Sequence, residues 1–579
     1  MRAALFRRAG FVGLVGGLAV AHLSLVGLVV ALNGVDLISE LVTVGSTITV
    51  IAAIAAGYVT TSPRRTDTEK PPLSVALPAG ALAGAITGLL ITLLAWFIEA
   101  ASPRAVLINA SPQLVEVLHW GQPVMVGNAI NIVGGALMGA AGAGLRVAPL
   151  AFRRGLITAL TTVVFLALMQ TFVGQILNGL QLEFITDFLF AREGMTQLGA
   201  AVTFVLFAVV GVFWASSRAD VKRRFAGLQP TQQRAARISG MGVVLIVLVT
   251  LPLFIGPFLS QTLDLVGIYI LLGLGLNIVV GFAGLLDLGY VAFYAVGAYA
   301  TAVLTSPASP IFAPQLDFWV AVPLVLAITA AIGLLIGAPV LRLRGDYLAI
   351  VTLGFGEIAR LIFQSNWMTP YLGGAQGILQ VPAPEIFGFS LRQPERLYYP
   401  ILVACILAAF AAISLANSRV GRAWTAMRED ESVAEATGVN TVKYKLLAFG
   451  LGATFGGLAG ALYAVRIGTV FPQELNIVVS INALALIILG GIGSIPGVIV
   501  GAIVLVGLPE LLREFSEYRL LLYGIVLVAM MLLRPEGFIP NRSRRAELHE
   551  GEGDSKPDWD EDDWEERAGE QTPEPRIST

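Results

Sequence analysis

The feature that most constrains this chain is a series of apolar runs, each about 18 to 25 residues long, that recurs along most of its length. A helix of about 20 apolar residues is long enough to cross the hydrocarbon core of a bilayer. The composition agrees, since 56% of the residues are hydrophobic and only 13% are charged. The sequence therefore predicts an all-α polytopic protein of the cell membrane, inner or plasma.

The basic residues between the apolar runs assign the sides of the membrane, because cytoplasmic loops carry an excess of Lys and Arg. In the first half, basic residues precede the run near 10–32, follow the second run, and cluster again after the fourth and sixth runs. The intervening gaps are acidic or nearly free of basic residues. We therefore predict six spans in residues 1–216, with the N-terminus in the cytoplasm and the first run retained as an anchor rather than cleaved as a signal peptide.

A basic cytoplasmic linker at residues 217–239 separates this N-terminal six-span extension from a second membrane module at residues 240–541. Eight apolar runs of the second module are predicted helices, which gives about 14 transmembrane helices in all and returns the C-terminus to the cytoplasm. They lie near residues 240–258, 265–283, 288–305, 318–341, 347–364, 398–416, 444–465 and 519–533. The tail at residues 542–579 is acidic and poor in aliphatic residues, so we predict a disordered cytoplasmic segment.

A further apolar region, residues 479–508, is interrupted near its middle by Gly490, Gly491, Gly493 and Pro496. Non-helical backbone at membrane depth is tolerated where it is buried in protein or lines a watery cavity. The region is therefore predicted to be a broken helix pair. It forms either two re-entrant half-helices or two tilted full spans joined by a turn.

Residues 418–445, which we call the handle, are a dense block of charge between two apolar runs. Ser432 and Glu435 have the spacing of a capping box and Gly438 is a candidate helix C-cap, which predicts a short helix presented to water. We interpret the handle as the docking place of a soluble motor; the alternative is a solvated loop that carries positive-inside charge. Trp424 and Met427 form an apolar i, i+3 pair, suited to a partner's groove or to packing on the membrane helices. The predicted coupling residues are Arg422, Trp424, Met427, Arg428, Glu429, Asp430, Glu431, Glu435 and Gly438.

Two opposite charges, Glu357 and Arg360, lie one helical turn apart within the apolar run 347–364. Ionisable residues inside a membrane are functional candidates, so we predict that this pair lies in the translocation path or locks two helices together. Glycines at 281, 284, 289 and 297 allow close approach of helices. The candidates for the path or for helix locking are Gly289, Tyr290, Glu357, Arg360, Gly374, Gly491, Gly493 and Pro496.

Four segments of the second module resemble the LIV-type permease family of ABC importers, and in particular its M-type membrane subunit. They are GLNIVVGFAGLLDLGYVAFYAVGAYATAVL (275–304), LRLRGDYLAIVTLGFGEIARLIF (341–363), SRVGRAWTAMREDESVAEATGVNTVKYKLLAF (418–449), and LGGIGSIPGVIVGAI (489–503) followed by LPELLREF. The resemblance covers roughly residues 240–541, and the N-terminal extension has no counterpart in the short family members. The chain has GGAQG, Gly373 to Gly377, where the family more often has Gly-Gly-x-Asn-Gly, so the role of this outer loop and the substrate stay open.

No lysine of this chain follows a glycine, so the phosphate-binding loop Gly-x-x-x-x-Gly-Lys-Ser/Thr is absent and the chain cannot hydrolyse ATP alone. The resemblance implies partners instead: an H-type permease subunit, two ATPase subunits that carry the ATP, and an extracytoplasmic amino-acid-binding protein. We expect no cofactor and no nucleic acid on this chain. Scattered histidines and the single Cys405 predict neither a metal site nor an intrachain disulfide.

These observations predict a transporter subunit rather than an enzyme. It would import branched-chain or related hydrophobic amino acids by alternating access, coupled to the ATPases through the handle. Three alternatives stay open. They are a urea or short-chain amide permease of the same family, an ion-coupled secondary transporter in which Glu357 carries a proton, and a non-transporting assembly subunit.

Overall fold

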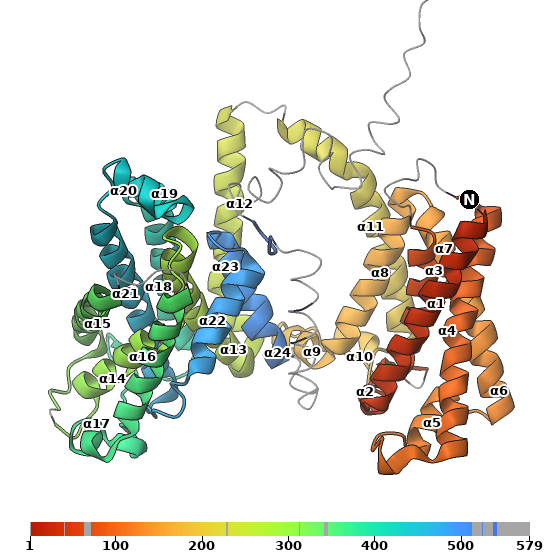
Figure 1. Ribbon diagram of the computed structural model, residues 1–579, viewed down its shortest axis with the longest axis horizontal. Coiled ribbons are helices and arrows are strands. Elements are labelled where there is room, and N and C mark those ends of the chain that lie inside the picture. The colour runs from red at the N-terminus through yellow and green to blue at the C-terminus, as the bar shows by residue number, and fades with distance from the viewer. Residues whose placement is uncertain are drawn as a thin grey trace, which may run out of the picture. The chain divides into compact units, whose positions relative to one another are not determined.

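The computed structural model describes residues 2–39, 41–62, 71–226, 230–311, 313–340, 346–511, 524, 528 and 536–540. It divides the chain into two compact units, Met1–Gly256 (unit 1) and Pro257–Thr579 (unit 2). Long helices dominate both units, and the described residues add only two sheets of two strands each (Figure 1). The predicted all-α class is therefore confirmed.

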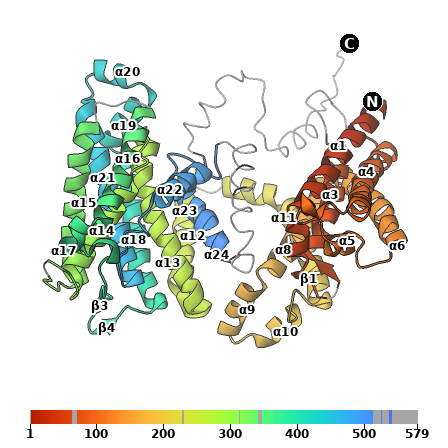
Figure 2. The same cartoon turned by 60° about the horizontal axis from the view of Figure 1, so that its bottom comes forward.

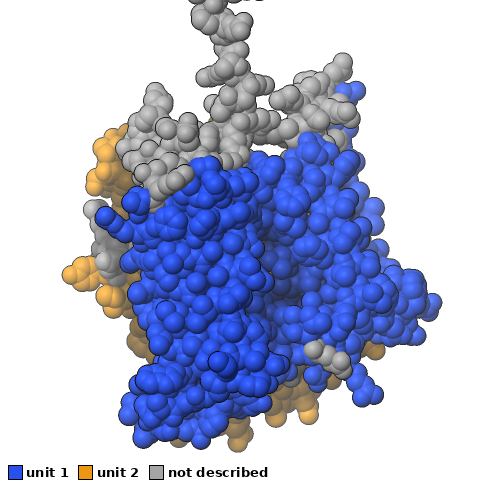
Figure 3. All heavy atoms as spheres, turned by 90° about the vertical axis from the view of Figure 1, so that its right-hand side faces the viewer, with its two compact units in different colours: residues 1–256 blue, residues 257–579 orange. Residues whose placement is uncertain are grey.

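Unit 1 is built around four helices, α1, α3, α4 and α7, which pack against one another, while α8 packs along α11 (Figures 1 and 2). Glycines make the close approaches possible: a Cβ at Gly84 would meet the backbone of Gly135, and one at Gly57 would meet that of Gly139. The face of unit 1 drawn in Figure 3 is hollowed near its middle. The elements are α1 (Arg2–Leu25), α2 (Leu28–Leu32), β1 (Asp36–Ile38), β2 (Val42–Thr43), α3 (Val44–Thr60), α4 (Leu73–Ala101), α5 (Pro112–Leu118), α6 (Val124–Ala129), the π-helix η2 (Ile130–Gly134), α7 (Gly135–Val147), α8 (Leu150–Leu168), α9 (Gln170–Gly179), α10 (Glu183–Leu189), α11 (Gln197–Ala226) and α12 (Pro230–Thr250).

Unit 2 begins within α13, at a break in the helix where Gly256 has a φ of 72°. The helices α14 and α15 pack along α21, and short helices and strands connect the longer helices. The elements are α13 (Pro252–Leu276), the π-helix η3 (Asn277–Phe282), α14 (Val291–Thr305), α15 (Phe318–Val340), α16 (Asp346–Gln364), α17 (Thr369–Leu372), β3 (Glu385–Ile386), β4 (Phe389–Ser390), α18 (Pro394–Ala416), α19 (Arg419–Glu429), α20 (Glu431–Ala436), α21 (Thr441–Ile467), α22 (Ile477–Gly490), α23 (Ile495–Ala502), the π-helix η6 (Ile503–Gly507) and α24 (Leu508–Leu511).

The core of unit 2 lies where α14 and α15 pack on α21. Glycines again set the spacing, because a Cβ at Gly297 of α14 would meet the backbone of Gly457, and one at Gly460 would meet the backbone of Tyr294. Helices that meet through glycine bring their backbones closer than side chains allow. The close helix approach predicted for Gly289 and Gly297 is confirmed, since Gly289 meets the backbone of Thr352 in the same way.

Ten helices in the described part of the chain are long and apolar enough to cross a membrane, or up to 11 if the bent pair counts as one span. Three further apolar helices, α3, the end of α12 (Ser239–Thr250) and α14, are shorter than 18 residues. The predicted number of about 14 spans is thus not confirmed. Of the predicted run at 519–533 the structure describes only residues 524 and 528, and the tail at 542–579 lies outside the described residues.

The predicted break near residue 490 is present. The helices Ile477–Gly490 and Ile495–Gly507 meet at an angle of 119°. Gly491 and Gly493 have φ values of 117° and 79°, which residues with a Cβ rarely adopt. Ser494 then caps α23 by accepting a hydrogen bond from the Gly497 N–H, and Pro496 occupies the first turn, where its missing N–H costs nothing.

Candidate functional site

The handle folds into two short helices, α19 and α20, between the ends of α18 and α21 (Figure 1). Asp430 has an extended backbone, and its carboxylate accepts hydrogen bonds from the N–H groups of Ser432 and Val433 at 2.8 and 3.0 Å. The predicted capping box of Ser432 and Glu435 is therefore wrong. α20 begins one residue before Ser432, and the Asp430 side chain already satisfies the free N–H groups of its first turn.

The end of α20 matches the prediction. Gly438 follows the helix with a φ of 92°. Its N–H donates to the carbonyl of Glu435, and the N–H of Val439 donates to that of Ala434, each at 3.0 Å. These two bonds make a Schellman motif with glycine at the left-handed position, so Gly438 stops the helix as expected.

The inner face of α19 is fixed to the membrane helices. Trp424 is fully buried, and its indole N–H donates to the main-chain carbonyl of Tyr444 in α21 at 2.8 Å. Met427 is 5% exposed and belongs to the same hydrophobic core. Of the two roles predicted for this pair, insertion into a partner's groove is wrong and packing on unit 2's own helices is correct. The apolar side of the amphipathic helix α19 faces inward.

Charged residues of the handle add two further attachments. Lys445 of α21 pairs with Glu431 at 2.5 Å, and the lysine side chain is only 5% exposed. Arg428 donates to the carbonyl of Gly281 at 3.0 Å and to the Glu429 carboxylate at 3.0 Å. Gly281 lies in η3, so α19 is attached both to α21 and to the end of α13.

The outer face of the handle stays open. Exposed residues on it include Arg422, Ala426 and Glu429 of α19, together with Ser432 and Glu435 of α20. The handle therefore combines a firmly attached inner face with an exposed outer face that carries charged residues beside Ala426 and Val433.

The bend between α22 and α23 also contacts η3, the π-helix to which Arg428 of the handle is bonded. The side-chain oxygen of Asn277 in η3 accepts a hydrogen bond from the Gly493 N–H at 2.8 Å. Gly284 has a φ of 71°, and a Cβ there would meet the Arg428 side chain. The segment after α13 thus touches both the handle and the break in the broken helix pair.

The start of α14 is held by hydrogen bonds from three helices. The Leu288 N–H donates to the Thr352 hydroxyl of α16 at 3.0 Å, and the Val291 N–H donates to the Ser480 hydroxyl of α22 at 2.8 Å. The hydroxyl of Tyr290, which is fully buried, donates to the carbonyl of Gly452 in α21 at 2.7 Å. The structure thus places Gly289 and Tyr290 in a packed junction of helices.

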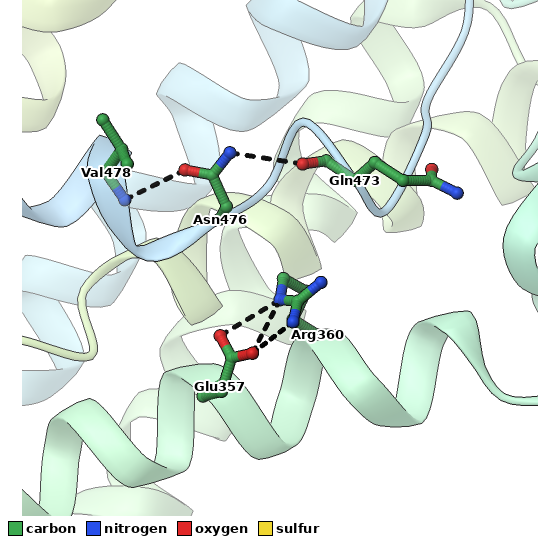
Figure 4. A network of polar contacts seen from close by, with 5 residues as sticks. All are labelled: Glu357, Arg360, Gln473, Asn476 and Val478. Carbon is green, nitrogen blue, oxygen red and sulfur yellow. Dashed lines mark hydrogen bonds and ion pairs between the residues drawn. The ribbon is translucent and has the colours of Figure 1, made fainter.

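Glu357 and Arg360 form an ion pair within α16, with both side chains on the same side of the helix (Figure 4). The glutamate side chain is 38% exposed and that of the arginine is 23% exposed. The prediction that this pair locks two helices is corrected, because both partners belong to one helix at i, i+3 spacing. A role in the translocation path stays a prediction.

We expect Glu357→Gln to lower uptake, and Glu357→Gln combined with Arg360→Gln to be less harmful than the sum of the single variants. Removing one partner leaves the other charge unpaired in an apolar helix, whereas removing both does not, so we expect the losses of the two single variants not to add. Initial uptake rates, normalised to the amount of protein in the membrane, measure these losses. Glu385→Gln, at an exposed strand residue, is the control. Strictly additive losses would show that the pair does not act as a unit.

The GGAQG segment makes a tight turn away from the handle. Gly373, Gly374 and Gly377 all have positive φ, and Ile378 bridges to Val470 just after α21. Gly374 is buried, and a Cβ there would meet the Thr369 side chain. The glycines therefore serve the shape of this turn.

Several polar residues that the sequence analysis did not single out occupy buried positions. Asp264, Asn277, Asp287, Thr352 and Ser480 are each at most 3% exposed. They could have been found from the sequence as polar residues inside or beside an apolar run, which is the signal that identified Glu357. Among the described residues, no group of three or more His, Cys, Asp or Glu side chains is placed to hold a metal ion.

Comparisons with known proteins identify relatives of this chain. A family model described as branched-chain amino acid transport system, permease component, matches residues 258–533. The chain is 40% identical over 332 residues to the high-affinity branched-chain amino acid transport system permease protein LivM of Salmonella typhimurium, covering 53% of this chain and 76% of that protein. LivM of Escherichia coli K12 is 40% identical over 331 residues, with the same coverage. The permease protein LivH of Salmonella typhimurium is 26% identical over 286 residues, covering 47% of this chain and 91% of that protein. No solved structure matches this chain. The chain therefore belongs to the branched-chain amino acid transport permease family, as an M-type member.

Proposed function

We propose that this chain is a membrane permease subunit of an ATP-driven importer for branched-chain or related hydrophobic amino acids. The observation that carries the proposal is the handle, with a buried inner face and an exposed, charged outer face that also presents Val433. A soluble ATPase needs such a surface, because a docking helix transmits force only if it is firmly attached to the helices that must move. The substrate class comes from the LivM relatives, which are branched-chain amino acid permease proteins.

The contacts of the handle suggest how ATP binding on the partner reaches the membrane helices. Trp424 and the Lys445–Glu431 pair connect the handle to α21, and Arg428 connects it to η3. Asn277 of η3 continues the connection to Gly493, in the bend between α22 and α23. A displacement of the handle would therefore act on the centre of unit 2 and on the broken helix pair together. Closure of the ATPases would shift the populations of outward-facing and inward-facing states.

The partners in this proposal are two ATPase subunits that carry the ATP, an H-type permease subunit and an extracytoplasmic amino-acid-binding protein. The handle and both chain termini would lie in the cytoplasm, in agreement with the excess of basic residues in the gaps assigned to that side. Similarity to LivH as well as LivM supports a permease pair in which both subunits share the fold of unit 2.

Cysteine cross-linking tests the docking. In a Cys405→Ala background, single cysteines at the exposed positions Ala426, Ser432 and Ala436 should cross-link to the ATPase subunit, with a yield that changes when ATP is added. Ala434 is unsuitable because it is only 2% exposed. A cysteine at Asp317, exposed at the start of α15, is the matched control and should give no such product. Labelling of all three handle positions by water-soluble reagents without any cross-link would refute the docking.

A further inference from the structure

Unit 2 holds a group of ionisable side chains that the proposed coupling does not use. Asp264 lies in α13, Glu395 in the first turn of α18, and Arg466 in the last turn of α21. The handle joins the end of α18 to the start of α21. Glu395 and Arg466 therefore lie at the opposite ends of these two helices, away from the handle. If the handle is cytoplasmic, this group lies near the extracytoplasmic side, where substrate arrives.

Asp264 and Arg466 are only partly satisfied by the protein itself. Asp264 is 1% exposed, and among the described residues neither of its carboxylate oxygens has a hydrogen-bond partner. Arg466 donates through Nη2 to the carbonyl of Gln261 at 3.3 Å, while its buried Nε has no partner among the described residues. Buried polar groups are nearly always hydrogen-bonded, so two such exceptions of opposite charge require an explanation.

The two groups lie in the same part of unit 2 without pairing directly. Arg466 lies beside the turn of α13 that contains Asp264, because Gln261, whose carbonyl accepts the Arg466 hydrogen bond, precedes Asp264 by three residues in the same helix. The ion pairs found among the described residues of unit 2 do not include one between Asp264 and Arg466. A structural ion pair would join their atoms directly, because that is the cheapest way to bury two charges. The Asp264 carboxylate therefore lacks a hydrogen-bond donor and the Arg466 Nε lacks an acceptor, and both lie in the same region of unit 2.

We propose that Asp264 and Arg466 bind the two charged ends of an α-amino acid zwitterion as it enters unit 2. The Asp264 carboxylate would accept hydrogen bonds from the substrate's ammonium group, which has three donors and no acceptor. The Arg466 guanidinium would donate to the substrate's carboxylate, the partner that its planar set of N–H groups fits. Each charge of the substrate then meets an opposite charge inside the membrane, where an unpaired charge is expensive. The inference rests on the proposed function, because it takes an amino acid as substrate.

Uptake by the complete complex tests this site. The chain is reconstituted in vesicles with the H-type permease and the ATPases, and uptake of radiolabelled leucine is measured with saturating, leucine-loaded binding protein. We expect Asp264→Asn and Arg466→Gln each to lower uptake at least about tenfold, because each variant leaves one charged end of the substrate without a partner. The amount of assembled complex recovered with each single variant should stay at the wild-type level. Asp317→Asn, at an exposed carboxylate, is the matched control and should transport normally.

The double variant separates a ligand site from a structural role. If the two residues only stabilised each other, Asp264→Asn with Arg466→Gln would restore uptake towards the wild-type rate. Under the proposal, the double variant assembles and its uptake is at least as impaired as that of either single variant. Wild-type uptake by a single variant, recovery in the double variant, or failure of the double variant to assemble would each overturn the site. A wild-type complex that takes up no branched-chain amino acid would overturn the proposed function instead.

Discussion

Trp424→Ala should abolish ATP-driven uptake by detaching α19 from α21. Trp424 is fully buried and donates to the Tyr444 carbonyl, so the variant loses both a large apolar contact and a hydrogen bond. Truncating a buried aromatic side chain costs about 3 to 5 kcal/mol, far more than one short helix gains by itself. Uptake and co-purification of the ATPase subunits should fall together, and both are measured on the reconstituted complex.

Two comparisons make this result specific. Trp424→Phe keeps most of the packing and loses only the hydrogen bond, so its defect should be intermediate. Trp319→Ala removes the same side chain from the start of α15, where Trp319 is 41% exposed and also donates to a main-chain carbonyl, that of Glu385. This control should retain most of its uptake. Equal defects in Trp424→Ala and Trp319→Ala would show that attachment of the handle is not the cause.

Gly297→Val should prevent unit 2 from folding. A Cβ at Gly297 would meet the backbone of Gly457, and a backbone cannot rotate away as a flexible side chain can. The helices α14 and α21 would have to separate along the crossing that forms the core of unit 2. The expected result is almost no monodisperse protein in size-exclusion chromatography of the detergent-solubilised chain, with most of it aggregated or degraded.

Gly354→Val, in α16, is the matched control. Gly354 is also a helical glycine of unit 2, but nothing lies within 4 Å of a Cβ placed there. It should therefore be recovered in nearly wild-type amount. Normal recovery of Gly297→Val would mean that the α14–α21 crossing is looser than the structure indicates.

The parts of this structure that were predicted correctly depend on local sequence. Apolar runs long enough to cross a bilayer indicated helices, and the glycines and proline near residue 490 indicated a break. Gly438 ends α20 because a left-handed residue is needed at that one position. Each of these features depends only on residues that are neighbours in the sequence, so the sequence pattern was sufficient to predict it.

The features that were not predicted correctly are of two kinds. Some are contacts between residues far apart in the sequence, and one is the choice between neighbouring residues as the cap of a helix. An amphipathic helix such as α19 shows that one face is apolar, but not whether its own protein or a partner covers that face, so the place of Trp424 was left open. The Asn277–Gly493 bond joins residues 216 positions apart, which no periodicity indicates. At α20, the predicted cap was Ser432, but the helix begins at Glu431, so the residue in the cap position is Asp430.

The attachments of α19 also have a consequence for how this surface tolerates change over evolution. Trp424 and Arg428 both donate to main-chain oxygens, those of Tyr444 and Gly281. Every residue type supplies a carbonyl at those positions, so the accepting side of the contact is independent of the side chain at 444. The donating side has no such freedom, because only particular side chains reach these oxygens. Mutations should therefore accumulate unequally across the contact, with α19 conserving its donors while the side chain at 444 drifts.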